Sequence, residues 1–81
     1  MREMKTRDAI SEWINDRLQA QTGCADAHAT VQYQLLEPDP DGCNWSRDLI
    51  LNYGTSDEVL VRSRLRPIYE EARRRFNVFE P

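Results

Sequence analysis

The chain has 81 residues, of which 40% are hydrophobic and 31% charged, and a formal net charge of −3. This composition predicts one folded domain spanning residues 1–81 and excludes a disordered chain, because this apolar fraction is enough to form a core. A domain of this size buries only about 60–65% of its unfolded surface, so we expect a thin core and no separate catalytic domain.

The sequence contains no apolar run that approaches the roughly 20 residues of a membrane span, and residues 1–8 are too polar for a signal peptide. We therefore expect a cytoplasmic protein without a membrane partner. Since disulfides are rare in that compartment, we expect the two cysteines, Cys24 and Cys43, to be free thiols.

The charge is distributed unevenly along the chain. Residues 24–61 hold seven acidic groups and one basic group, whereas residues 62–81 hold six arginines and three glutamates. An acidic middle and a basic end help to steer charged partners, although they do not decide the fold.

A first helix is predicted from about residue 6 to residue 22. Thr6 is a favourable N-cap, Asp8 suits the positive end of the helix dipole, and Gly23 can adopt the left-handed conformation that ends a helix. Apolar residues recur at helical spacing and define one buried stripe, formed by Ile10, Trp13, Ile14 and Leu18.

Two strands are predicted next, and we expect them to form an antiparallel hairpin. Residues 31–37 alternate between apolar and polar side chains, which is typical of a half-buried strand. The prolines and aspartates of residues 38–42 predict a tight turn, with Gly42 supplying a positive φ. The second strand lies within residues 44–53, where four side chains share one face, namely Trp45, Leu49, Leu51 and Tyr53.

Residues 55–76 allow two interpretations. One is a long, kinked helix, because Thr55 and Glu58 match a capping box and apolar residues recur at spacings of three and four. The other makes residues 58–65 a third strand and begins a short helix at Pro67, because a proline inside a helix costs about 3 kcal/mol. The apolar stripe of the long helix would consist of Val61, Leu65, Ile68, Ala72 and Phe76.

The predicted fold class is α+β. An N-terminal and a C-terminal helix are expected to pack on one face of a small antiparallel β-hairpin, in the order α-β-β-α. If residues 58–65 form a strand, the sheet has three strands and the order becomes α-β-β-β-α. Asn77 is the expected C-cap of the last helix, and Val78 and Phe79 either fold back onto the core or remain exposed.

A row of arginines on the C-terminal helix is the first candidate for a binding surface. Arg62, Arg66 and Arg73 fall on one strip beside the apolar face, and Tyr69 borders that strip. Guanidinium groups next to an aromatic ring suit an acidic protein surface or phosphates. The alternative is a solvated helix face, because two neighbouring glutamates can pair with arginines one turn away.

Trp45 is the second candidate. A large aromatic residue just after a turn can anchor a partner, because such residues dominate the energetics of interfaces. The alternative is that its ring covers one end of a thin core.

Three potential metal ligands, Cys24, His28 and Cys43, form the third set. The spacing of Cys24 and His28 is close to that of zinc sites, but a fourth ligand would have to come from Asp26 or Asp41. Cys43 and His28 are also the one nucleophile and base that can be combined. Inert thiols and a surface histidine are the simpler interpretation, so we expect no metal, no cofactor and no catalytic residue.

We therefore expect a non-enzymatic module that binds another protein through Trp45, Arg62, Arg66, Tyr69 and Arg73. The alternative is a nucleic-acid-binding accessory protein that would use the arginines of the last helix, namely Arg62, Arg64, Arg66, Arg73, Arg74 and Arg75. A metal-binding or thiol-redox protein is a minor alternative. The sequence is compatible with both a monomer and a homodimer.

Overall fold

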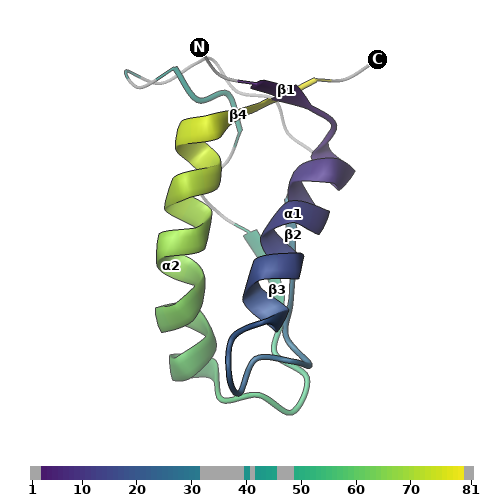
Figure 1. Cartoon of the computed structure of the whole chain (residues 1–81), viewed down its shortest axis with the longest axis vertical. Coiled ribbons are helices and arrows are strands. Elements are labelled where there is room, and N and C mark those ends of the chain that lie inside the picture. The colour runs from purple at the N-terminus through teal and green to yellow at the C-terminus, as the bar shows by residue number, and fades with distance from the viewer. Residues whose placement is uncertain (1–2, 32–39, 41, 46–48, 80–81) are drawn as a thin grey trace.

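The computed structural model describes residues 3–31, 40, 42–45 and 49–79 (Figure 1). In chain order, its elements are β1 (Glu3–Lys5), α1 (Arg7–Gln19), β2 (His28–Val31), β3 (Leu49–Asn52), α2 (Glu58–Arg75) and β4 (Phe76–Val78). The α+β class is confirmed. The observed order among the described residues, β-α-β-β-α-β, differs from both predicted orders, because one short strand precedes α1 and another follows α2. Strands of three residues are too short to show a clear alternation in the sequence.

The strands form two separate two-stranded sheets in the described part of the chain. β2 and β3 pair antiparallel, as predicted, with Thr30 opposite Ile50, but β2 begins three residues before the first predicted strand, residues 31–37, and shares only Val31 with it. β1 and β4 pair in parallel, with Met4 opposite Asn77, and this pairing joins segments near the two ends of the chain. Figure 1 shows the β1–β4 pair above the two helices, which run side by side.

α1 begins as the sequence predicts and ends earlier. The hydroxyl oxygen of Thr6 accepts a hydrogen bond from the backbone N–H of Ala9 at 3.1 Å, so Thr6 is the N-cap. The helix ends at Gln19, and the backbone then turns through hydrogen bonds such as that from Gln21 N–H to the Leu18 carbonyl at 3.0 Å. Gly23, with a φ of 84°, lies in this turn and does not cap the helix directly.

α2 is one continuous helix, so the interpretation of residues 58–65 as a strand is wrong. The helix continues through Pro67, and one of its faces is buried, at Val61, Leu65, Ile68 and Ala72. Its N-cap is Asp57, whose carboxylate accepts from the Leu60 N–H at 3.0 Å, and not the predicted Thr55. The Thr55 hydroxyl instead donates a hydrogen bond to the carboxylate of Asp26.

The segment after α2 forms β4 and does not leave the fold. Phe76 is the C-cap of the helix, with extended backbone angles, whereas the predicted cap Asn77 lies within the strand. Val78 is buried, and Phe79 is 48% exposed. Val78 therefore folds back onto the core, whereas Phe79 remains largely exposed.

Val31 is the one residue of the first predicted strand that the structure describes, and the rest of β2, residues 28–30, precedes that prediction. The rest of the first predicted strand lies outside the described residues, as does the 38–42 turn except for Pro40 and Gly42. The predicted faces are confirmed where the structure describes them, because Leu49, Leu51 and Tyr53 are half-buried while Ile50 is 59% exposed.

The core lies between the two helices and the two sheets. Trp45 and Phe76 are its largest fully buried side chains, and the ring of Trp13 packs edge-to-face on Phe76 with 5.2 Å between centroids. The apolar stripe of α1 contributes three buried residues, Ile10, Ile14 and Leu18.

Neither of the described helices combines the length and apolar character that crossing a membrane requires.

Candidate functional site

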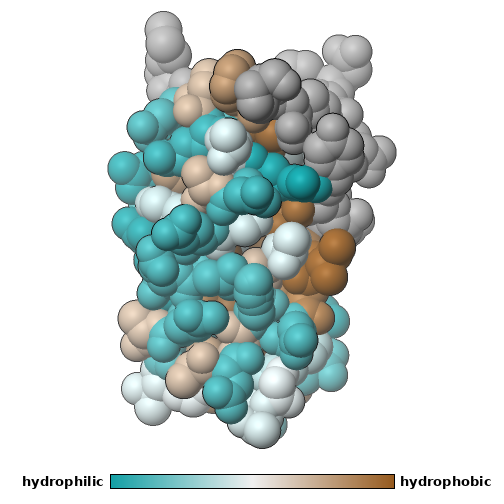
Figure 2. All heavy atoms as spheres, turned by 90° about the vertical axis from the view of Figure 1, so that its right-hand side faces the viewer, coloured by the Kyte–Doolittle hydropathy of each residue, from teal (hydrophilic) through white to brown (hydrophobic). Residues whose placement is uncertain are grey.

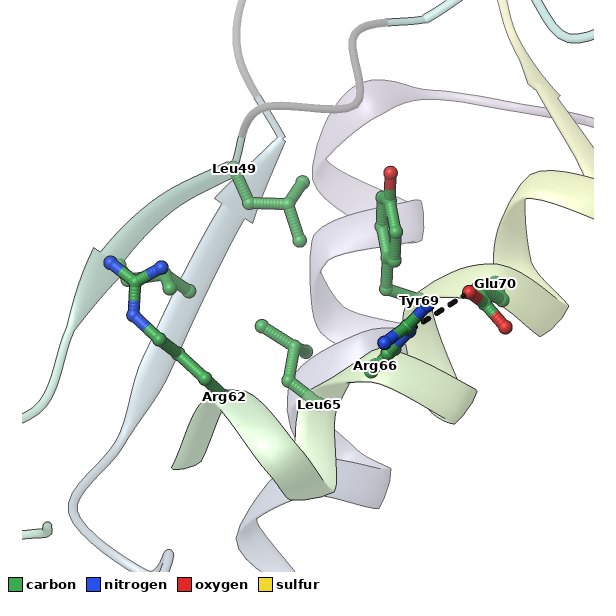
Figure 3. A pocket seen from close by; sticks show the side chains of 7 residues that line it. Leu49, Arg62, Leu65, Arg66, Tyr69 and Glu70 are labelled. Atoms are coloured by element: carbon green, nitrogen blue, oxygen red, sulfur yellow. Dashed lines mark hydrogen bonds and ion pairs between the residues drawn. The ribbon is translucent and has the colours of Figure 1, made fainter. Parts of the chain in front are cut away.

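A hollow of about 410 Å³ lies between α2 and β3, and we call it the α2–β3 groove. It is lined by Leu49, Leu51, Arg62, Leu65, Arg66, Tyr69 and Glu70. Figure 3 shows Leu49 on β3 facing Leu65 and Tyr69 on α2, with Arg62 and Arg66 on either side of Leu65. Three of the five predicted binding residues, Arg62, Arg66 and Tyr69, therefore border one groove.

The floor of the groove is apolar. Leu49 and Leu51 contribute because alternate residues of a strand share one face. Leu65 and Tyr69 contribute because residues four apart lie on the same side of a helix. Leu65 is almost completely buried and the other three are half-buried, so the floor combines a packed base with accessible apolar surface.

The rim of the groove carries exposed guanidinium groups. The Arg62 Nε lies 3.3 Å from a Glu58 carboxylate oxygen, and the Arg66 Nε lies 3.3 Å from a carboxylate oxygen of Glu70. The side chains of the two arginines are 64% and 80% exposed. Exposed i,i+4 ion pairs contribute only about 0.3–0.5 kcal/mol, so carboxylates of a partner can compete for either arginine.

Trp45 supports the groove from inside the protein. Its ring is 1% exposed and meets Tyr69 edge-to-face, with centroids 6.4 Å apart and planes at 83°. Its indole N–H donates to the Phe76 carbonyl at 3.0 Å. Trp45 therefore has almost no surface to offer a partner and instead packs against Tyr69 from inside the protein.

Arg73 is also part of the internal structure. One of its guanidinium nitrogens donates to the Trp45 carbonyl at 2.5 Å, and the guanidinium carbon lies 5.4 Å from the centroid of the Trp45 ring. The predicted row of arginines is therefore divided, with Arg62 and Arg66 at the groove and Arg73 bound to the core.

The remaining arginines of α2 do not extend the groove. Arg75 pairs with Glu71 at 2.9 Å, as the spacing predicts. Arg64 and Arg74 are exposed and make no ion pair with any described residue. The six arginines named for nucleic-acid binding are thus dispersed over different environments.

A second hollow, of about 400 Å³, lies between α1 and β2 and is lined by polar side chains. Within it the side-chain amide of Asn15 donates to the Ala29 carbonyl and accepts from the Ala29 N–H, both at 2.7 Å. The Ser11 hydroxyl accepts from the Val31 N–H at 2.9 Å. Figure 2 shows that the side of the molecule carrying α1 is mostly hydrophilic. The polar side chains of Asn15 and Ser11 are thus hydrogen-bonded to the backbone of β2.

The cysteines and the histidine do not form a common site. Cys24 and Cys43 are both free and buried, whereas His28 is exposed, with its Nε2 3.4 Å from the Asn15 amide nitrogen. Within residues 3–31, 40, 42–45 and 49–79, no three side chains of the metal-ligating types come together. The structure therefore adds no support for the metal-binding alternative.

Sequence reasoning did not include Leu49, Leu51 and Leu65 in the site, because their periodicity assigns them only to a buried face. Whether such a face is completely covered depends on the separation of α2 and β3, and the spacing of apolar residues in the sequence does not predict that separation.

No protein-family model matches the chain, and neither the curated proteins nor the solved structures include a significant match. The geometry of the α2–β3 groove is thus the basis for a functional proposal.

Proposed function

We propose that this chain is a non-enzymatic protein-interaction module and that the α2–β3 groove binds a segment of another protein. One observation carries the proposal, namely an accessible apolar floor bordered by the exposed arginines Arg62 and Arg66. Interfaces commonly combine an apolar centre with a polar rim, and tyrosine and arginine are enriched among the residues that dominate binding energy.

The composition of the groove supports recognition over catalysis. Its lining consists of three leucines, two arginines, one tyrosine and one glutamate. Acid–base or nucleophilic catalysis most often uses a histidine, a cysteine, a serine or paired carboxylates. Glu70 is the one carboxylate in that lining, so no second lining carboxylate pairs with it, and it forms an ion pair with Arg66.

The arginines favour a protein partner over nucleic acid. Binding to a phosphate backbone depends on several cationic groups acting together. On α2, Glu58 precedes the first three arginines, Glu70 and Glu71 separate these from the last three, and Arg73 is bound to the carbonyl of Trp45. The positive charge of α2 is therefore interrupted by carboxylates and is not continuous along the helix.

The proposal is tested by selecting ligands without assuming their identity. The immobilised chain is panned against phage-displayed random peptides of about 12 residues, long enough to cross the groove at roughly 3.3 Å per residue. Enriched peptides are then synthesised, and their affinity for the chain is measured by fluorescence anisotropy. We expect the Arg62→Glu/Arg66→Glu variant to bind them at least about tenfold more weakly, a loss of about 1.4 kcal/mol.

The matched control is Arg64→Glu/Arg74→Glu, which makes the same change in charge on the same helix outside the groove. This control should bind the peptides within about threefold of the unmodified chain. No enrichment, or an equal loss in both variants, would contradict the proposal. DNA binding at about 50 mM salt that Arg64→Glu/Arg74→Glu abolishes would instead favour the nucleic-acid alternative.

A further inference from the structure

The outer edge of β2 is closed by side chains of α1. The side-chain amide of Asn15 forms hydrogen bonds with both the N–H and the carbonyl of Ala29, and the Ser11 hydroxyl accepts one from the N–H of Val31. Four residues after Asn15 on α1, the side-chain amide of Gln19 donates to the Ala27 carbonyl at 3.0 Å. Three polar residues at i, i+4 and i+8 of α1 therefore stand where a neighbouring strand would lie.

These bonds determine which backbone groups of β3 face outward. In an antiparallel pair, opposed residues alternate between exchanging hydrogen bonds and directing their N–H and carbonyl groups away from each other. Because Ala29 bonds to α1, its partner Leu51 must also direct its backbone groups away from the hairpin. The same reasoning applies to Leu49, which is opposite Val31.

The outer edge of β3 therefore presents the N–H and carbonyl groups of Leu49 and Leu51. The structure gives these groups no hydrogen-bond partner among the described residues. The side chains of the same two leucines form part of the floor of the α2–β3 groove. An unpaired strand edge is a template for another strand, and here it lies beside an apolar groove.

We propose that the occupant of the α2–β3 groove is an extended, acidic segment of another protein, which adds to β3 as a third strand of the hairpin sheet. This inference rests on the proposed function and specifies its binding mode. Backbone hydrogen bonds to Leu49 and Leu51 provide affinity, and alternate side chains of the added strand enter the groove.

The charge of α2 selects an acidic segment. The helix holds six arginines and three glutamates. The two arginines at the groove form exposed ion pairs, and the guanidinium carbon of Arg62 also lies 5.9 Å from the centroid of the Tyr53 ring. Side chains on the helix-facing side of the added strand lie beside Leu49 and Leu51. Apolar side chains at these positions cover the leucines, and carboxylates two residues away, on the same face of the added strand, reach Arg62 and Arg66.

Amide hydrogen exchange followed by NMR tests the binding mode with the peptide enriched in the selection above. We expect exchange at the Leu49 and Leu51 amides to slow by about tenfold when the peptide binds, because they become hydrogen-bonded. The amides of Ile50 and Asn52 are the internal control, since they already face β2. Their exchange should change by less than about twofold.

A peptide series with single N-methyl groups provides the second measurement. Strand addition predicts that N-methylation weakens binding at every other position, because only alternate N–H groups of the peptide face β3. The strand model would be overturned if binding depends on Arg62 and Arg66, but N-methylation has no alternating effect and the Leu49 and Leu51 amides are not protected. That result would leave the proposed function intact. Protection of these two amides that rises with protein concentration, without peptide, would overturn the strand model in favour of a second copy of the chain.

Discussion

The side-chain amide of Asn15 takes the place of a neighbouring strand beside Ala29. It donates to the carbonyl of Ala29 and accepts from the N–H of the same residue, and both distances are 2.7 Å. Asn44 makes the same arrangement with Val78 of β4, at 3.1 Å and 2.8 Å. In a fold with very short strands, two asparagines thus satisfy backbone groups that would otherwise be buried without partners.

Replacing Asn15 with alanine is expected to destabilise the protein by about 3 kcal/mol, because a buried N–H and a buried carbonyl both lose their partner. Urea denaturation followed by circular dichroism measures the change in the free energy of unfolding. The control is Asp16→Ala, an exposed position on the same helix, which should change stability by less than about 0.5 kcal/mol. Equal effects of the two substitutions would show that the Asn15 hydrogen bonds contribute nothing specific.

Trp45→Phe is expected to lower the free energy of unfolding by about 2–4 kcal/mol, because it leaves a space in the core and removes the donor to the Phe76 carbonyl. Trp13→Phe makes the same chemical change at a half-buried ring whose indole N–H bonds to no described residue. We expect it to cost less than half as much. Thermal unfolding of both variants tests this order, and a larger effect at Trp13 would contradict the assignment of Trp45 to the core.

Pro67→Ala is expected to stabilise the protein by about 2 kcal/mol. Alanine restores an N–H that can bond to the Ser63 carbonyl within α2, and the exposed position has room for it. Greater flexibility of the unfolded chain offsets the gain by less than about 1 kcal/mol. Differential scanning calorimetry should show a higher Tm. An unchanged or lower Tm would mean that Pro67 has a favourable role in α2 that its position does not reveal.

Neither cysteine should react with a thiol reagent in the folded protein, because both side chains are buried. In a denaturant, the same reagent should titrate two thiols per chain, the number in the sequence. Mass spectrometry of the labelled protein gives the count. Fewer than two thiols after unfolding would indicate a disulfide and contradict the free state of Cys24 and Cys43.

Both helices could be predicted, the second beside a strand alternative for residues 58–65, because helical periodicity is a local property of the sequence. For α2, four buried residues outweigh the proline, since burying one large apolar side chain contributes about 1.5–3 kcal/mol and a proline inside a helix costs about 3 kcal/mol. The exact N-cap was less predictable. Thr55 and Asp57 are both suitable caps, and in the structure Asp57 accepts from the Leu60 N–H while the Thr55 hydroxyl donates to Asp26.

The candidate site could be predicted in part. The helical spacing placed Arg62, Arg66 and Tyr69 together, and all three line the α2–β3 groove. The same spacing grouped them with Arg73, whose guanidinium bonds instead to the Trp45 carbonyl. A residue at the border of a helix face can turn toward solvent or toward the core, and the neighbouring element decides which.

By itself, the sequence predicted the first helix, the second strand of the hairpin and the apolar faces of both, whereas it left residues 58–65 open between helix and strand and placed the first hairpin strand at residues 31–37, later than β2. Only the tertiary structure decided which strand edges are closed, where the α2–β3 groove lies, and that β1 pairs with β4. The reason is physical. Periodicity records the environment of each residue along one element, whereas the pairing of Met4 with Asn77, or of Asn44 with Val78, is a contact between distant segments and leaves no repeating pattern in the chain.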